Sequence, residues 1–239
     1  MDTPAYRNFH TYLDEDHHRR PKEMFVRIGD LLAARLPTLP EKPRVLDVGC
    51  ATGALVGYLR ERFPAMDFCG IDISPDLIKV AREKVPGATF SVMSALDLPD
   101  AQLAPFDVVL CVGVLGVFGD EQARRCVEGI LASTKAGGVA YILSNFNSDD
   151  VDVLVSYRTR GGDTMGSWNG GWNIYSKFTL QEWCKARART IRFIDFEMPF
   201  PIEKRDNPVR TWTFQADGRL RLTNGLKLVV DLSFAEIAV

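Results

Sequence analysis

The sequence lacks a hydrophobic run long enough to cross a membrane. No window approaches the roughly 18 apolar residues that a membrane-spanning helix needs. The start, MDTPAYRNFHTYLDEDHHRRP, has no apolar core between a basic head and a small-residue cleavage site, so it does not have the pattern of a signal peptide. These two absences predict a cytoplasmic protein without a membrane partner.

An excess of charge of one sign and metal-ligand patterns are missing as well. Lys and Arg number 29 and Asp and Glu 31, which gives a net charge of -2 and no basic footprint for nucleic acid. The five cysteines form no C-x-x-C pair and no ligand-spaced cluster with the three histidines, so we expect no metal. An odd cysteine count also argues against a disulfide framework, and the cysteines are expected to be small buried side chains.

The pattern that is present is an alternation of strands and helices. With 239 residues, 46% of them hydrophobic, the chain can bury the core of one α/β domain. Near-continuous apolar runs predict strands at 44–49, 67–73, 89–93, 106–112 and 137–145. Helical spacing predicts helices at 22–36, ended by Pro37, at about 53–63, after Pro75, at 120–134 and at 178–188. The segment 190–198 reads as extended.

This alternation is typical of a doubly wound, mostly parallel seven-stranded sheet in a Rossmann-like three-layer sandwich. Near the C-terminus, Asp217-Gly218 and Asn224-Gly225 are hairpin signals. We therefore expect antiparallel strands at the end of the sheet. The expected organisation is a helical lid over 1–40 and a main domain over 41–239, which includes a substrate-side insertion at 148–176 and C-terminal strands at 189–239.

The turn VLDVGCATG, residues 45–53, carries the main functional signal. Glycines between a strand and a helix let a ligand approach free backbone N–H groups closely. The dinucleotide pattern G-x-G-x-x-G/A is matched imperfectly, because residue 51 is Ala. Asp47 would oppose a pyrophosphate but would favour the sulfonium and ammonium groups of S-adenosylmethionine. Asp72 stands where a carboxylate accepts hydrogen bonds from ribose hydroxyls.

At this point the sequence resembles the class I S-adenosylmethionine-dependent methyltransferases, a class of enzyme with EC numbers beginning 2.1.1. VLDVGCATG resembles their first motif, GIDIS their ribose acid and SALDLP their adenine segment. FDVVLCVGVL and KAGGVAYI resemble their fourth and fifth strands. The resemblance runs from about Arg44 to Asn145 and implies S-adenosylmethionine as cofactor.

The resemblance also implies the residues that bind the cofactor. Backbone of the first motif would flank the methionyl group and adenosine, Asp72 would hold the ribose, and Ile73 would pack on adenine. Ser94 departs from the family, which often has Asp at this position. The implied cofactor-binding residues are Asp47, Gly49, Cys50, Ala51, Gly53, Asp72, Ile73, Ser94, Ala95, Leu96 and Val112. Taken singly, each glycine could merely serve a tight turn, and Asp47 could be a structural cap.

A catalytic base is not evident in the core motifs. Methyl transfer mainly needs an aligned nucleophile, so a strong base is optional. Many relatives have a histidine or an acid just after strand four, where this chain has Gly116 and Val117. We expect instead that His10, Tyr12 or His17, in the N-terminal lid, touches the reacting centre.

The acceptor would bind beside the carboxyl ends of the strands. Aromatic, amide and guanidinium groups there suit a sugar-like molecule or one that bears a carboxylate or phosphate. The predicted substrate-binding residues are Tyr157, Arg158, Trp168, Trp172, Asn173 and Tyr175. The alternative is a surface loop whose tryptophans pack on the sheet.

Three other functions stay open from the sequence. One is an enzyme that uses the same cofactor for aminopropyl or carboxymethyl chemistry. Another is an NAD-dependent dehydrogenase, against which Asp47 and Ala51 argue. The last is a cofactor-binding protein without turnover. The favoured prediction is methyl transfer to an oxygen or nitrogen of a polar small molecule; the oligomeric state stays open, with a homodimer as one option.

Overall fold

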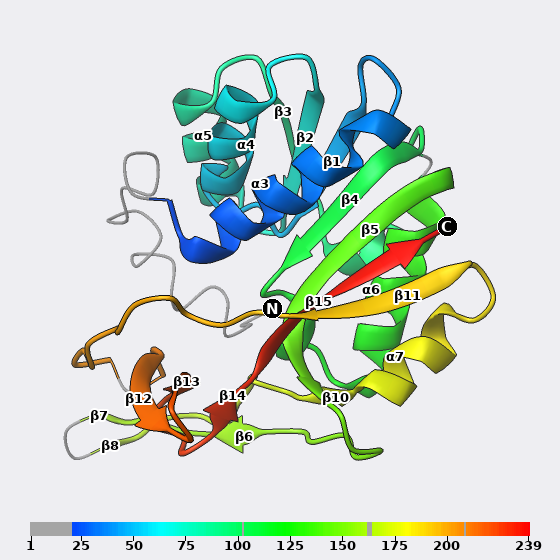
Figure 1. Ribbon diagram of the computed structural model, residues 1–239. Coiled ribbons are helices and arrows are strands. Elements are labelled where there is room, and N and C mark those ends of the chain that lie inside the picture. The colour runs from blue at the N-terminus through cyan, green and yellow to red at the C-terminus, as the bar shows by residue number, and fades with distance from the viewer. Residues whose placement is uncertain (1–20, 102, 162–163, 208) are drawn as a thin grey trace.

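The computed structural model describes residues 21–101, 103–161, 164–207 and 209–239. One large sheet organises this part of the chain, with strand order β3-β2-β1-β4-β5-β15-β11 (Figure 1). The first five of these strands are mutually parallel, whereas β15 runs antiparallel to β5 and β11 antiparallel to β15. Their bounds are Thr89–Val92, Asp67–Asp72, Arg44–Val48, Phe106–Val112, Thr134–Asn147, Leu232–Ala238 and Thr190–Asp195. The predicted doubly wound, mostly parallel sheet with antiparallel C-terminal strands is confirmed.

Helices cover both faces of the sheet and make the three layers. Helices α3 (Glu23–Arg35), α4 (Ala54–Arg62) and α5 (Pro75–Lys84) pack on one face. Helices α6 (Asp120–Ser133) and α7 (Lys177–Cys184) pack on the other. Short 3-10 helices η1 (Leu36–Thr38), η2 (Ala95–Asp97) and η3 (Leu115–Val117) lie in the connections. None of the described helices is long and apolar enough to span a bilayer.

Strand alternation produces two hydrophobic cores. Because successive side chains of a strand point to opposite faces, Leu110 of β4 joins the core beneath α3, α4 and α5, and Cys111 joins the core beneath α6 and α7. Both side chains are fully buried. This explains why the predicted strands are apolar throughout rather than alternating.

The N-terminal helix ends slightly earlier than predicted. Ile28 and Leu32 are fully buried in the core beside α4, but α3 ends at Arg35. Leu36, predicted to be the last apolar residue of this helix, lies in η1 and is exposed, because the chain tightens into a 3-10 turn before Pro37 can interrupt an α-helix. Residues 1–20, the rest of the predicted lid, lie outside the described part.

The C-terminal hairpin signals form a separate sheet. Asp217 and Gly218 both have positive φ and make a two-residue turn between β12 (Trp212–Ala216) and β13 (Arg219–Thr223). The second hairpin joins β13 to β14 (Val229–Val230) through a longer loop, 224–228. Antiparallel strands at the end of the large sheet were therefore correctly predicted. They are β15 and β11, however, and not the strands of these two hairpins.

The insertion at 148–176, which has no clear period in sequence, forms one antiparallel ribbon. Its paired segments are β6 (Ser156–Tyr157) with β9 (Asn169–Gly170) and β7 (Arg160–Gly161) with β8 (Thr164–Met165). A bridge between Val153 and Ile174 closes its base, and β10 (Tyr175–Ser176) then pairs parallel with the end of β5. In Figure 1 the ribbon and the small sheet β12-β13-β14 lie beyond the carboxyl ends of the parallel strands.

Candidate functional site

The turn after β1 has three residues in the left-handed region of φ and packs tightly against its neighbours. Gly49, Ala51 and Gly53 all have positive φ, at 77°, 47° and 73°. The N–H groups of Gly49 and Cys50 donate to the carbonyl of Ile71 over 2.8 and 2.9 Å, which ties the turn to β2. A Cβ on Gly49 would lie 2.4 Å from Val114 Cγ2, so this position has no room for a side chain. The turn is therefore held tightly against the ends of β2 and β4.

Asp72, the last residue of β2, links this turn to the start of α5. One carboxylate oxygen accepts from the Ala51 N–H at 3.0 Å and the other from the Ser74 N–H at 2.9 Å. Burial raises the pKa of Asp72, and hydrogen bonds from the backbone of Ser74, Ala51 and Ile73 act against that shift. The carboxylate stays half-buried and keeps lone pairs for further donors. This is the arrangement expected of a group that accepts hydrogen bonds from a diol.

Asp47, inside β1, is buried and lies close enough to Asp72 to feel its charge. Its side chain is only 3% exposed, and within the described residues no hydrogen bond or ion pair engages its carboxylate. Burial, with a smaller contribution from Asp72, raises the pKa of Asp47 to about 7. A cation placed here would favour the ionised carboxylate. Burial and the same two carboxylates raise the pKa of the Cys50 thiol, which makes it a poor nucleophile.

The remaining predicted cofactor-binding residues surround this turn. Ile73 follows Asp72 and is 39% exposed, an unusual exposure for an isoleucine that the predicted packing on adenine would remove. Ser94 Oγ accepts from the Leu96 N–H at 3.2 Å and caps η2. Ala95 is buried and Val112 is half-buried at the end of β4. The Ser94 hydroxyl is thus already engaged in a cap, although it can still donate.

Two of the predicted substrate-binding residues fasten the ribbon to the loop after β4. The side-chain amide of Asn173 and the hydroxyl of Tyr175 both donate to the carbonyl of Phe118, each over 2.6 Å. The Asn173 backbone N–H donates to the Gly116 carbonyl at 2.9 Å, and its side-chain oxygen accepts from the Val155 N–H at 2.8 Å. Both side chains are buried, so their polar groups serve these contacts.

The other predicted substrate-binding residues lie along the ribbon. The Arg158 guanidinium lies 4.8 Å from the ring centre of Trp168, which is itself 64% exposed. Tyr157 pairs with Asn169, and Trp172 is half-buried with a φ of 63°. In the predicted set, Asn173 and Tyr175 are therefore buried, whereas Arg158 and Trp168 are exposed to solvent. The predicted catalytic residues His10, Tyr12 and His17 lie outside the described residues.

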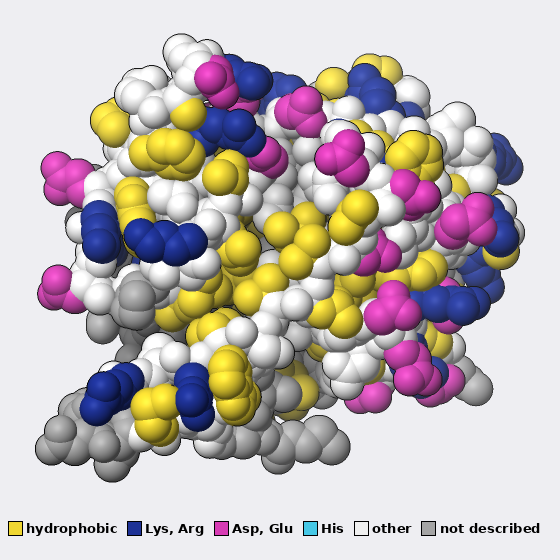
Figure 2. Space-filling view, turned by 90° about the horizontal axis from the view of Figure 1, so that it is seen from below, with side chains coloured by type: hydrophobic (Ala, Val, Ile, Leu, Met, Phe, Trp, Pro, Cys, Tyr) yellow, Lys and Arg dark blue, Asp and Glu magenta, His cyan; other side chains and the backbone are white. Residues whose placement is uncertain are grey.

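Figure 2 shows the face at the carboxyl ends of the parallel strands. Hydrophobic side chains gather across its middle, and charged side chains lie mostly around its periphery. Ile73, Val92 and Val117 are among the large apolar side chains left exposed at this edge of the sheet. Among the described residues, no group of three or more His, Cys, Asp and Glu side chains could hold a metal ion.

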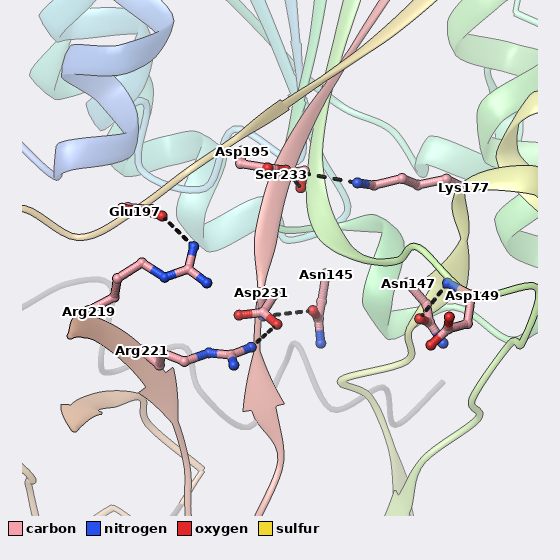
Figure 3. Close-up of polar contacts among 10 residues, drawn as sticks. All are labelled: Asn145, Asn147, Asp149, Lys177, Asp195, Glu197, Arg219, Arg221, Asp231 and Ser233. Atoms are coloured by element: carbon pink, nitrogen blue, oxygen red, sulfur yellow. Dashed lines mark hydrogen bonds and ion pairs between the residues drawn. The ribbon is translucent and has the colours of Figure 1, made fainter. Parts of the chain in front are cut away.

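A cavity of about 370 Å³ lies at the same edge of the sheet, beside β5, β11 and β15. Charged side chains of its wall are drawn in Figure 3. No sequence motif predicts this cavity, because its wall combines four distant segments. Only the topology brings 146–149, 195–198, 219–222 and 230–233 together, with Lys177 at the start of α7.

Comparisons with known proteins agree with this geometry. Residues 45–138 match the family model described as a methyltransferase domain. A malonyl-[acyl-carrier protein] O-methyltransferase of Magnetococcus marinus is 31% identical over 149 residues, which are 60% of this chain and 48% of the relative. A trans-aconitate 2-methyltransferase of Variovorax paradoxus is 30% identical over 56% of this chain and 50% of the relative. The chain thus spans about half the length of these curated relatives.

A solved structure extends the likeness in fold to the whole chain. An amino pentose methyltransferase of Micromonospora echinaspora superposes with a TM-score of 0.57 at 18% identity, covering 100% of this chain and 98% of the other. Fold and turn geometry together define a Rossmann-like methyltransferase domain. Residues 45–138 thus contain a methyltransferase domain, and the described residues have the Rossmann-like fold of the class I S-adenosylmethionine-dependent methyltransferases that the motifs resemble.

Proposed function

We propose that this protein is an enzyme that transfers a methyl group from S-adenosylmethionine to an oxygen or nitrogen of a polar small molecule. The observation that carries the proposal is the linked pair of loops after β1 and β2. Asp72 accepts N–H groups from both loops, and the buried Asp47 lies beneath them. The acceptor atom and the activity of the whole protein are part of the proposal.

The residues present fit the cofactor. Gly49 and Gly53 have positive φ, and a Cβ on either would lie within 3.0 Å of a neighbouring side chain, so glycine at both positions lets the turn close tightly beside Asp72. Asp47 supplies a buried negative charge that has no cationic partner among the described residues. A sulfonium ligand supplies such a charge, whereas a diphosphate would be repelled.

Each predicted cofactor residue has a distinct role in the proposal. Asp72 would accept from ribose hydroxyls, and Ile73 would cover adenine. The η2 segment, with Ser94, Ala95 and Leu96, would bound the adenine edge, and Val112 would line the cavity. When bound, S-adenosylmethionine supplies a methyl group already activated by its positive sulfur.

The chain's own contribution to the reaction would be alignment and exclusion of water. Asn173 and Tyr175 hold the loop after β4 through the Phe118 carbonyl, and in this proposal that loop would form a wall beside the reacting centre. Alignment of this kind can supply several kcal/mol of the barrier. If the acceptor must lose a proton, we propose that His10, Tyr12 or His17 receives it. Replacement of all three together should then lower turnover, and unchanged turnover would end that assignment.

The acceptor class is supported by the names of similar proteins. The comparisons include enzymes named for trans-aconitate and for an amino pentose, which are polar small molecules. The direct test is incubation with S-adenosylmethionine carrying an isotopically labelled methyl group and a panel of polar acceptors, followed by mass spectrometry. The proposal expects label on one acceptor class, with formation of S-adenosylhomocysteine; cofactor binding without labelled product across the panel would contradict it.

A second candidate, a cofactor-binding protein without turnover, has one observation in its favour. Gly116 and Val117, in η3, provide no acid or base after β4. The same labelling experiment separates the two candidates, because a binding protein would retain cofactor affinity and give no labelled product.

A further inference from the structure

The cavity beside β5 contains more carboxylates than cations. Its wall holds Lys177, Arg219 and Arg221, against four acidic side chains, Asp149, Asp195, Glu197 and Asp231. In Figure 3 these side chains come from opposite sides of β15, with Glu197 and Arg219 on one side and Asp149 and Lys177 on the other.

Every cation of this wall already has an acidic partner. Lys177 Nζ lies 3.8 Å from Asp195, and Arg219 bonds Glu197 over 3.1 Å. Arg221 pairs with Asp231. Asp195 also accepts from the Ser233 hydroxyl at 2.9 Å.

Asp149 is the one acidic side chain of this wall that has no cationic partner among the described residues. It is exposed at the edge of the cavity, and among the described residues nothing bonds its carboxylate. A ligand carboxylate or phosphate would therefore have to compete with Asp195, Glu197 or Asp231 for a cation and would face a net negative wall. Hydroxyl and ammonium groups can instead donate to these carboxylates without breaking an existing pair.

Size and apolar contacts narrow the ligand further. The cavity volume of about 370 Å³ lies at the lower end of the roughly 300–1,000 Å³ typical of small-molecule sites. Phe146, Phe196 and Leu220 also line the cavity and give its wall an apolar part. A saturated ring with hydroxyl groups at its edge presents both kinds of surface.

The cavity lies near the proposed cofactor turn but is separate from it. In the sheet, β4 lies between β1 and β5. The ends of β1 and β5 are therefore two strand spacings apart, about 10 Å. Asn145 Oδ1 accepts from the Asp231 N–H at 3.0 Å and fixes the start of β15 against β5. The wall is thus built on the same sheet that positions the turn.

We propose that this cavity binds the ring of a neutral or amine-bearing polyol, such as a sugar or an amino sugar, as part of the acceptor. The inference rests on the proposed function. It narrows the class of acceptor, because it excludes a ring that bears a carboxylate or a phosphate. The ring would lie in the cavity, and the reacting group would extend toward the end of β4.

The test uses three methyl glycosides with the same ring and different charge, those of glucosamine, glucose and glucuronic acid. Each is titrated by ligand-observed NMR into the full-length protein saturated with S-adenosylhomocysteine. We expect the glucosamine and glucose derivatives to bind at least tenfold more tightly than the glucuronide. Asp149→Asn should reduce the preference for glucosamine over glucuronide about threefold, the effect of one exposed charge. Leu220→Trp should fill the cavity and abolish binding of all three.

Asp67→Asn is the matched control. Asp67 is likewise an exposed acid, but it pairs with Arg44 at 3.7 Å and begins β2, at the opposite edge of the sheet from the cavity. This variant should keep the wild-type preference. If Leu220→Trp does not fold, Asp149→Asn decides the result.

The outcomes separate the two proposals. If wild-type protein does not bind S-adenosylhomocysteine, the proposed function fails. If it does, but no glycoside binds, the glucuronide binds most tightly, or Asp149→Asn leaves the preference unchanged, only the assignment of this cavity is overturned.

Discussion

Replacing Asp47 by Asn should stabilise the ligand-free protein at pH 8. The Asp47 carboxylate is buried, and burial followed by the nearby charge of Asp72 raises its pKa from 3.8 to about 7. At pH 8 the folded protein must therefore keep an ionised carboxylate in its interior. The other titratable groups coupled to it are the Cys50 and Cys111 thiols, which cannot offset its charge.

The magnitude follows from proton linkage. Because the folded pKa lies above the unfolded value, the folded state binds more protons between pH 3.8 and about 7, so stability falls as pH rises through this window and is level above it. About three pH units at about 1.4 kcal/mol each give a cost of roughly 4 kcal/mol at pH 8. The side-chain amide introduced by the substitution would bury an NH₂ group without a partner, which costs about 1–3 kcal/mol. The expected net gain is therefore about 1–3 kcal/mol at pH 8.

Urea unfolding of the wild type and Asp47→Asn at pH 8 and pH 4.5 measures this difference. The gain should disappear at pH 4.5, where the wild-type carboxyl is mostly protonated. The same variant should lose more affinity for S-adenosylmethionine than for S-adenosylhomocysteine, because only the former has a positive sulfur. Equal destabilisation at both pH values would show that the Asp47 charge is not costly and that its carboxyl acts as a structural hydrogen-bond acceptor.

Three further substitutions test other parts of the site. Gly49→Ala should cost about 1–3 kcal/mol in urea unfolding and weaken S-adenosylhomocysteine binding, because φ is +77° and the new Cβ would lie 2.4 Å from Val114 Cγ2. Tyr175→Phe should lower stability by about 1 kcal/mol through loss of its bond to the Phe118 carbonyl, and unchanged stability would show that this bond contributes nothing. Arg158→Ala should weaken acceptor binding in a titration and leave S-adenosylhomocysteine affinity intact; equal loss of both would indicate a folding defect.

The sequence predicts the fold well where one segment determines its own structure. The β1 turn is the best case, because Gly49 and Gly53 adopt the positive φ that their positions suggested. Ala51 shows the limit of residue type, since it also takes a left-handed conformation, at φ 47°, where the dinucleotide pattern would have a glycine.

Prediction is weaker where distant segments meet. The substrate-binding roles of Asn173 and Tyr175 stay predictions from residue type, and their contacts with Phe118, 55 and 57 residues earlier in the chain, could not be predicted from the sequence. The ribbon has no clear period because its paired segments, such as β6 and β7, are only two residues long, too short to show an alternation of apolar and polar residues. The hairpin signal at Asp217-Gly218 gave the turn correctly and could not indicate which sheet its strands join.

The central claim is that the loops after β1 and β2 bind an adenosyl-sulfur ligand through the Asp72 carboxylate. Calorimetric titration of S-adenosylhomocysteine into the wild type and Asp72→Ala tests it most directly. We expect binding to the wild type and at least tenfold weaker binding to the variant, because hydrogen bonds to a charged group each contribute about 1.5–3 kcal/mol. No heat of binding with correctly folded wild-type protein, or equal affinity in the variant, would contradict it.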